Sequence, residues 1–272
     1  MKKTFLYSTI IATSLLSACG EQTPEVVESP ETPAVVEDAP YSEQIDNLLV
    51  YEAETATEYP NASLTMTSPA SGEAVAGTNA FSFEVKDYEL GIQTEEAEER
   101  NCANSAKGQH IHFILNNAPY KAKYEASFEE DLEEGNNVLL AFISRSYHES
   151  IKNGSAYEIR QINTSGGEGE YDLDNDPHLF YSRPKGSYDY SESTRILLDF
   201  YLINTDLAGN GNKVRATING KVFELPKWAP YFIEGLPLGE NTVRLELIDK
   251  DGNPVPGPFN DSGERSFTIT QG

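Results

Sequence analysis

Three histidines and an arginine are the residues of this chain whose types and spacing best suit chemistry. His110 and His112 are two positions apart in a segment typical of a β-strand, so their side chains should point to one face of a sheet. Arg145 and His148 lie in the segment 144–149, where the next strand is expected to leave the sheet. Because the second half of the chain has cations at the positions matching the two strand histidines, we expect His110 and His112 to be exposed or half exposed.

This cluster supports two chemical interpretations and one purely structural one. Neutral imidazoles at His110, His112 and His148 could bind a Zn or Cu ion, with Cys102 as a further soft ligand. Alternatively, Arg145 and protonated histidines could hold a phosphate, sulfate or carboxylate. In the structural interpretation, the histidines pair with carboxylates on a solvated face. A metal site loses affinity as the pH falls, whereas an anion site built on imidazolium gains it.

Two further groups lie in the second half of the chain. Arg183 and Lys185 stand among tyrosines, and Trp228 is the only tryptophan. Aromatic faces beside cations suit peptide or sugar binding, although Trp228 could instead cap a core. Carboxylates at alternate positions could bind Ca, but an acidic solvated linker is the favoured interpretation of these residues. They are Asp172, Asp174 and Asp176.

No catalytic constellation is visible in the sequence. It contains no Gly-x-Ser-x-Gly elbow, no paired His-Glu metalloprotease motif and no phosphate-cradling loop. Cys102 lies in an acidic loop, where neighbouring carboxylates would raise its pKa and disfavour the thiolate. The chain is therefore not expected to be an enzyme.

An internal repeat predicts the elements that must position these residues. Short segments alternate between apolar and polar residues, are rich in β-branched or aromatic residues and are separated by Gly, Asn and Pro. The segment 128–137 matches 232–241 at a constant shift of 104 positions, and 139–143 matches 243–247. The pattern predicts an all-β chain with two tandem immunoglobulin-like β-sandwich domains. Their expected bounds are 61–165 and 177–272, with an acidic insert at 94–106.

The N-terminus has the features of an exported chain. Two lysines precede an apolar run that is too short to span a bilayer. The run ends in Leu16-Ser17-Ala18-Cys19, which resembles the bacterial lipobox. That resemblance implies a signal peptide at 1–18 and acylation of Cys19, for example with palmitate, giving a stable membrane anchor. Residues 19–60 contain eleven acidic residues and no Lys or Arg, which predicts a disordered tether with at most a short helix at 41–51.

The formal net charge of −24 limits the partners of the chain. Such an acidic protein is not expected to bind nucleic acid or anionic membrane surfaces. Cys102 is the only cysteine besides Cys19, so no disulfide is expected within the folded body, which must be stabilised by its hydrophobic cores.

Three stretches resemble a family of lipoproteins from Bacteroidota with tandem Ig-like domains, some of which are called phosphopeptide-binding proteins. The stretches are 108–113, 144–150 and 180–186. The resemblance implies phosphoryl recognition, for which Arg145, His148, Arg183 and Lys185 have suitable chemistry. The expected function is that of an outer-membrane lipoprotein, on the periplasmic face or cell surface, that binds a peptide, an anion or an envelope partner. The alternative is an envelope metal-binding protein that uses the three histidines.

Overall fold

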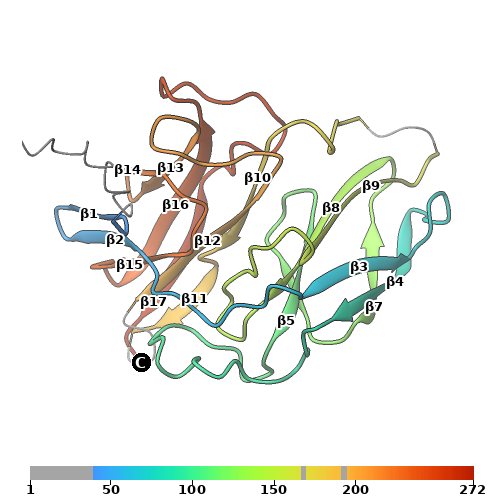
Figure 1. Cartoon of the computed structure of the whole chain (residues 1–272), viewed down its shortest axis with the longest axis horizontal. Coiled ribbons are helices and arrows are strands. Elements are labelled where there is room, and N and C mark those ends of the chain that lie inside the picture. The colour runs from blue at the N-terminus through green and yellow to red at the C-terminus, as the bar shows by residue number, and fades with distance from the viewer. Residues whose placement is uncertain (1–38, 167–169, 191–194) are drawn as a thin grey trace, which may run out of the picture. The chain divides into compact units, whose positions relative to one another are not determined.

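The computed structural model describes residues 39–166, 170–190 and 195–272. Cys19 and the expected signal peptide lie outside these residues. In the described part of the chain, every regular element is a β-strand, and no helix there is long and apolar enough to cross a membrane. The expected all-β class is confirmed (Figure 1).

The first sandwich consists of a three-stranded sheet in the order β3-β4-β7 and a four-stranded sheet in the order β6-β5-β8-β9. Alternate residues of each strand face the other sheet, and Phe81 and Phe113 meet edge to face there with ring centroids 5.0 Å apart. The strands are β3 (Ser63–Ser68), β4 (Gly77–Lys86), β5 (His110–Leu115), β6 (Lys121–Lys123), β7 (Ser127–Leu132), β8 (Asn136–Ser144) and β9 (Tyr157–Asn163).

The second sandwich repeats this arrangement. One sheet has the order β15-β12-β10, and the other has the order β11-β17-β16-β13-β14. Because the strands pair in the same pattern in both copies, the expected pair of immunoglobulin-like sandwiches is confirmed. The strands are β10 (His178–Arg183), β11 (Gly186–Asp189), β12 (Ile196–Ile203), β13 (Lys213–Ile218), β14 (Lys221–Leu225), β15 (Tyr231–Glu234), β16 (Gly239–Ile248) and β17 (Arg265–Thr270).

Two asparagines at the same corner of each sandwich make the same hydrogen bonds in both copies, so the sequence repeat is also a structural repeat. Asn137 donates to the carbonyls of Glu133 and Gly135 at 2.9 and 3.1 Å, and Asn241 donates to the carbonyls two and four positions before it at the same distances. Asn116 and Asn219 adopt positive φ and accept a hydrogen bond from the backbone of the facing strand at 2.8 Å. The same residue type therefore satisfies the same exposed backbone groups in each copy.

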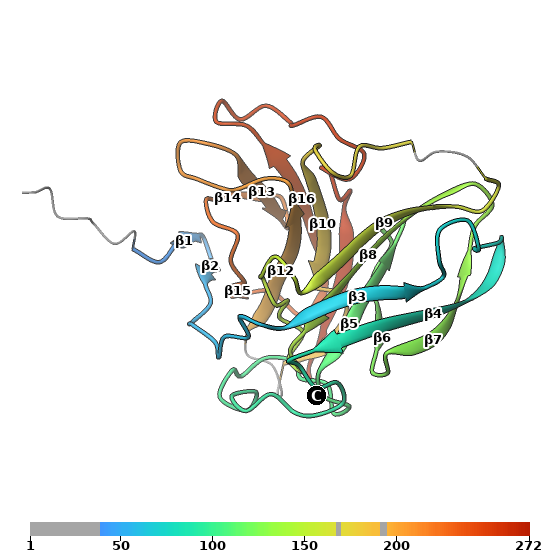
Figure 2. The same ribbon diagram turned by 45° about the vertical axis from the view of Figure 1, so that its right-hand side comes forward.

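The prediction of a disordered tether over 19–60 is wrong at its C-terminal end, and so is the short helix at 41–51. Strands β1 (Ser42–Ile45) and β2 (Leu48–Glu52) form a hairpin there. Strand β2 pairs antiparallel with the distant strand β15, Glu52 facing Tyr231 and Val50 facing Ile233, and places Leu48 and Val50 in the second core. The hairpin covers an edge of the second sandwich, as Figure 2 shows, and the acidic composition of the segment concealed this long-range pairing.

Gly235 allows the hairpin to approach the second sandwich closely. Its φ is +79°, and a Cβ there would lie 1.7 Å from the carbonyl oxygen of Asn47. Gly220 is a matched control, since its φ is +77° and a Cβ would meet nothing within 4 Å. We expect Gly220→Ala to cost about 1–2 kcal/mol through its left-handed backbone alone. Gly235→Ala should cost at least about 1 kcal/mol more. Equal losses in urea unfolding would contradict the packing of the hairpin described here.

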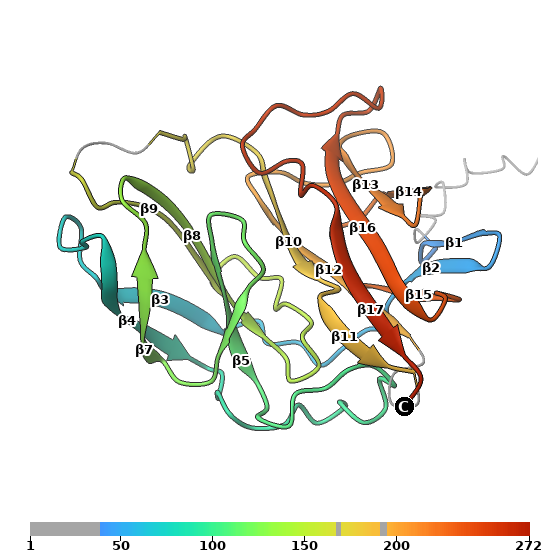
Figure 3. The same cartoon turned by 180° about the vertical axis from the view of Figure 1, so that it is seen from behind.

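The two sandwiches share a hydrophobic cluster, which explains why several strands are apolar on both faces. In β8, the residues between those of the first core, including Leu140 and Phe142, pack with Phe180 of β10 and Tyr201 of β12. The rings of Phe142 and Tyr201 stack with centroids 4.6 Å apart. Strands buried on both faces read as continuous apolar runs rather than as alternating ones. Figure 3 shows these elements from behind.

A buried ion pair lies in the same interface. Asp199 of β12 has no exposed surface, and its carboxylate pairs with Lys152 and accepts a hydrogen bond from Ser150 at 2.9 Å. Lys152 and Ser150 belong to the loop after β8, so the pair joins the two sandwiches. A buried carboxylate is tolerated only with such partners, and the pair therefore fixes how the two sheets meet.

Candidate metal centre

Strand β5 presents His110 and His112 on its outer face, as their spacing predicted. The prediction that these two side chains are exposed is wrong, because neither has any accessible surface. The outer face of this sheet is covered by the second sandwich, and the Nδ1 atom of His112 lies 3.1 Å from the Oγ atom of Ser182 in β10. The matching strand β13 of the second copy has Lys213 and Arg215 there, half exposed.

His148 reaches the same place from a tight turn that follows β8. The backbone amide of His148 donates to the carbonyl of Arg145 at 2.9 Å, and that of Arg145 donates to the carbonyl of Glu149 at 2.9 Å. His148 adopts a φ of +72°, which is unusual for a residue with a side chain. Backbone conformations of this kind collect at functional sites, where the surrounding structure holds them in place.

The ring nitrogens of the three histidines converge. The Nε2 atom of His110 lies 3.0 Å from Nε2 of His112 and 3.1 Å from Nδ1 of His148, and the three atoms all lie within 4.8 Å of one another. Zn–N bonds of 2.0–2.1 Å at tetrahedral angles place neighbouring nitrogens about 3.3 Å apart. The two separations from His110 are therefore close to those of a three-histidine metal site.

Hydrogen bonds on the far sides of two rings prepare these nitrogens as ligands. The Nδ1 atom of His110 lies 2.8 Å from the carbonyl oxygen of Gly108, which can only accept, so Nδ1 carries the proton and Nε2 keeps its lone pair. The hydroxyl of Ser182 can accept from His112 in the same way. Ligating histidines are typically oriented by such contacts. With Nδ1 protonated on both rings, the Nε2 atoms of His110 and His112 present two lone pairs to each other at 3.0 Å with no proton between them, an arrangement that a bound cation would satisfy.

Burial keeps all three histidines neutral, which is the form that binds a metal ion. Desolvation, together with the nearby cations Arg183 and Lys185, lowers the pKa of His110 to about 4. The pKa values of His112 and His148 are well below the usual range for the same principal reason. Neutral imidazole cannot attract an anion by charge, so the anion interpretation loses the support that protonated histidines would have given it.

The metal-free protein should lose stability as the pH falls from about 6.5 to about 4. In this window the unfolded chain binds a proton at His110 and the folded chain does not, because the pKa of His110 is about 4 only in the folded state. The difference between the unfolded and folded pKa of His110 corresponds to roughly 3 kcal/mol of stability. Burial raises the pKa of Glu149, so the folded chain takes up a proton there at a higher pH than the unfolded chain does. Glu149 therefore adds stability as the pH falls, which offsets part of the loss due to His110.

The contribution of His110 can be isolated by comparison with His110→Gln. Urea unfolding with a chelator present, at pH 7 and at pH 4.5, should show a smaller acid-induced loss in the variant than in the natural chain. Equal losses would show that His110 does not stay neutral in the folded protein.

Two of the candidate ligand-binding residues lie away from the histidines: Arg145, which the sequence grouped with them, and Trp228 of the second group. Arg145 forms a buried ion pair with Glu149 at 2.9 Å and stacks over Tyr59, rather than joining the cluster. Trp228 packs edge to face on Tyr201 and donates to the carbonyl of Phe200, so it belongs to the interface of the two sandwiches. Arg183 and Lys185 do lie beside the histidines, over the ring of Tyr120. The sequence analysis did not single out Tyr120, whose ring stacks on that of His112.

The other proposed metal ligands are not gathered. Cys102 is buried with apolar neighbours in the cluster that holds Tyr147 and Phe232, and burial, more than the nearby carboxylate of Glu149, raises its pKa to about 12. The acidic segment closes a turn in which the carboxylate of Asp172 accepts hydrogen bonds from Asn175. In the described residues, the three histidines are the only group of three or more potential ligands, so the calcium site over Asp172, Asp174 and Asp176 is not formed.

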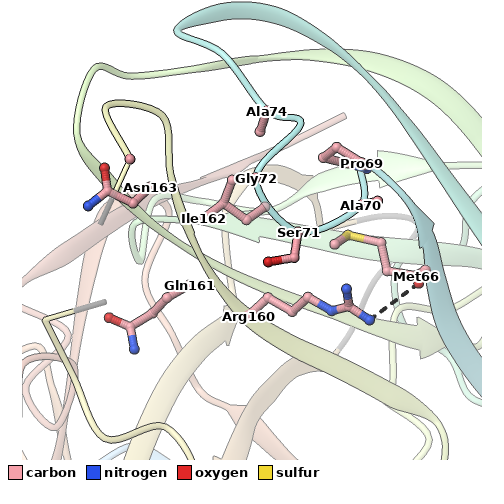
Figure 4. Close-up of a pocket in the computed structure, with 11 residues that line it drawn as sticks. Met66, Pro69, Ala70, Ser71, Gly72, Ala74, Arg160, Gln161, Ile162 and Asn163 are labelled. Atoms are coloured by element: carbon pink, nitrogen blue, oxygen red, sulfur yellow. Dashed lines mark hydrogen bonds between the residues drawn. The ribbon is translucent and has the colours of Figure 1, made fainter. Parts of the chain in front are cut away.

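Two cavities lie away from the histidines. One of about 300 Å³ opens between the β3–β4 turn and β9 (Figure 4), where Arg160 donates to the carbonyl of Met66 at 3.3 Å and pairs with Glu158. The other, of about 400 Å³, lies between the segments 52–60 and 145–153 and is lined by Arg145 and Glu149. Neither has a histidine in its lining, and neither opens onto the candidate metal centre.

Comparisons with known proteins identify no family. No protein-family profile and no curated protein matches the chain. Among solved structures, it is similar to fibronectin(III)-like modules of Clostridium thermocellum CbhA, with 14% identity over 76% of this chain and 93% of that one, at a TM-score of 0.25. It is also similar to a Bacteroides ovatus glucan-utilization protein, SGBP-B in complex with a mixed-linkage heptasaccharide, with 10% identity over 78% of this chain and 71% of that one, at a TM-score of 0.21. The FN1–FN3 domains of chicken CNTN1 have 10% identity over 77% of this chain and 65% of that one, at a TM-score of 0.23. These scores are too low to transfer any function.

Proposed function

We propose that this chain is a cell-envelope lipoprotein whose first sandwich binds one Zn or Cu ion between His110, His112 and His148. The observation that carries the proposal is the convergence of three neutral ring nitrogens, two of them 3.0 and 3.1 Å from the third. Imidazole ligands suit late first-row transition metals and are a poor choice for Ca or Mg, which prefer oxygen.

The burial of the site favours a structural or storage role for the ion over catalysis. His110 and His112 have no exposed surface, His148 is only partly exposed, and neither of the two cavities described above has a histidine in its lining. Catalytic metal sites keep an open position for water or substrate, whereas structural sites are closed. Because Ser182 of the second sandwich orients His112, a bound ion would also stabilise the packing of the two sandwiches.

Recognition of a phosphorylated peptide or another anion at this cluster is less well supported. Arg183 and Lys185 provide positive charge, but Arg183 is buried and the histidines are neutral. A peptide phosphate also needs access from solvent, which the buried rings of His110 and His112 do not offer. Inorganic phosphate therefore serves as the comparison ligand in the binding experiment.

Calorimetric titration tests the proposed site. The protein is the chain without residues 1–18 and with Cys19→Ser, titrated at pH 7 with Zn²⁺, Cu²⁺, Ca²⁺ and phosphate. We expect one equivalent of Zn²⁺ or Cu²⁺ to bind with a Kd below about 1 µM, and no comparable binding of Ca²⁺ or phosphate. Absence of one-to-one binding of both transition metals would refute the proposal.

The lipid anchor is a separate part of the proposal, supported by the order of the positive, apolar and lipobox segments before Cys19. We expect Cys19→Ser to abolish incorporation of labelled palmitate and to move the protein from the membrane fraction to the soluble fraction of the cell. Cys102→Ser is the matched control, since it removes the only other cysteine. Retention of the Cys19→Ser chain in the membrane with its label would contradict the anchor.

A further inference from the structure

An amine and a carboxyl group are held in contact where the two sandwiches meet. The Nζ atom of Lys152, in the loop after β8, lies 2.5 Å from Oδ1 of Asp199 in β12. The hydroxyl of Ser150 bridges the two groups, because it accepts a hydrogen bond from Nζ at 2.6 Å and donates one to Oδ1 at 2.9 Å. Two groups that can condense with each other are therefore fixed side by side within one folded chain.

This pair is the least exposed of the lysine–carboxylate pairs in the described part of the chain. The side chains of Lys152 and Asp199 are 12% and 0% exposed. Lys221 and Asp46 lie at the same distance of 2.5 Å, but their side chains are 43% and 69% exposed. Water stabilises the two charges of the exposed pair, whereas the buried pair has lost that stabilisation. An uncharged product is therefore favoured in the buried pair and not in the exposed one.

One oxygen of the buried carboxylate is left without a partner. The Oδ2 atom of Asp199 is buried and has no hydrogen-bond partner among the described residues. A buried acceptor that makes no hydrogen bond costs free energy, and more so when it carries charge. An amide has a single oxygen and no charge. Joining Asp199 to Lys152 would therefore remove both buried charges and one of the two acceptors.

We infer that Lys152 and Asp199 form an intramolecular amide bond, which links the two sandwiches covalently. One proton passes from Nζ to the carboxylate through the hydroxyl of Ser150, which is hydrogen-bonded to both groups. The lone pair that is freed on Nζ attacks Cγ and forms the C–N bond. A second proton leaves Nζ, the bond from Cγ to one oxygen breaks, and that oxygen departs with the electron pair and both protons as water. No other reactant is needed, and contact between the groups supplies the advantage of an intramolecular reaction.

The surroundings of the pair suit this reaction and its product. Lys152 and Ser150 line the cavity of about 400 Å³, through which the released water can leave. The bond would connect positions 47 residues apart, beside the cluster shared by the two sandwiches. No disulfide can do this within the folded body, since Cys102 is the only cysteine besides Cys19. No histidine takes part, so the inference does not depend on the proposed metal site.

Mass spectrometry of the denatured protein tests the inference. The protein is the chain without residues 1–18 and with Cys19→Ser, and its mass should be lower than that of its sequence by one water molecule. Trypsin does not cleave after an acylated lysine, so the peptide 146–160 should be recovered uncleaved and joined to the peptide 196–213. Cleavage after Lys221 should proceed normally, because the exposed pair stays ionic.

Lys152→Arg is the matched control, because a guanidinium keeps the charge opposite Asp199 but stays protonated and does not attack a carboxyl group. This variant should have the full mass of its sequence and release the peptide 196–213 free. A natural chain with its full mass and complete cleavage after Lys152 would overturn the inference. Loss of water without the joined peptides would also overturn it, since Asp251-Gly252 can lose water by cyclising.

Discussion

Replacing His112 with glutamine is expected to lower the affinity for Zn²⁺ at least about 100-fold. Removing a residue that merely hydrogen-bonds to a metal ligand typically lowers the affinity about 10- to 100-fold, and removing the ligand itself should cost more. His112 contributes one of the three converging nitrogens and lies 3.0 Å from His110. Glutamine fills much of the space of the imidazole but offers no comparable nitrogen lone pair. The titration that tests the proposed function also measures this change.

The fourth histidine of the chain is the control for this variant. His178 is buried in β10, as His112 is in β5, but it lies outside the cluster, with Nε2 3.3 Å from the carbonyl of Asp172. We expect His178→Gln to bind Zn²⁺ as the natural chain does. A ligand at 100 times its Kd raises stability by about 2.7 kcal/mol, so thermal unfolding should show protection by Zn²⁺ in His178→Gln and none in His112→Gln. Equal affinities in the two variants would show that the ion binds elsewhere.

Phe180→Ala is expected to lower the free energy of unfolding by about 3–5 kcal/mol, the usual range for a buried aromatic residue in a well-packed core. Phe180 has no exposed surface and stacks on Phe259, with centroids 5.0 Å apart, within the cluster shared by the two sandwiches. Trp228, the only tryptophan, packs against the same cluster, so its fluorescence reports directly on the interface during urea unfolding.

Tyr190→Ala is the comparison for this experiment, because Tyr190 is an aromatic residue with 52% of its surface exposed. Its replacement should change stability by less than about 0.5 kcal/mol. We also expect the tryptophan signal and the far-ultraviolet circular dichroism of the natural chain to change in a single transition, since both sandwiches lose their shared cluster together. Separate transitions, or a loss below about 1 kcal/mol for Phe180→Ala, would mean that the interface contributes little.

The two sandwiches could be predicted because apolar residues that face a core alternate with other residues along each strand. Leu139, Ala141 and Ile143 of β8 all lie in the first core, and the matching residues of β16 lie in the second. The shared interface is recorded differently, by apolar residues at the positions between these, such as Val138 and Leu140. A continuous run of this kind shows that a second face is buried, but not what covers it.

The hairpin β1–β2 shows the limit of composition as a guide. Residues 42–52 lie in a stretch without basic residues, which predicts disorder. The short apolar run Leu48–Val50 nevertheless joins its hairpin to a sheet whose other three strands, β10, β12 and β15, all begin at His178 or later. Local sequence does not specify such a partner, because the free energy of pairing depends on an edge strand formed by a distant segment.

The candidate site was predicted in its ligands but not in its environment. The spacing of His110 and His112 placed both rings on one face, and the departure of 144–149 from the repeat indicated that His148 was unusual. Their burial was not foreseen, because the comparison with Lys213 and Arg215 assumed that both copies have the same neighbours. In this chain the sheet with β5 and β8 packs on the second sandwich, whereas on β13, the counterpart of β5, the residues between the buried ones are half exposed. No signal in a single sequence identified Tyr120.

The most direct measurement of the central claim is an anomalous difference map, recorded at the zinc absorption edge from crystals of the zinc-loaded chain. The claim predicts one peak, within about 2.0–2.1 Å of Nε2 of His110, Nε2 of His112 and Nδ1 of His148. A zinc-loaded crystal in which these nitrogens remain hydrogen-bonded to one another, with no peak between them or with the peak at another site, would contradict it.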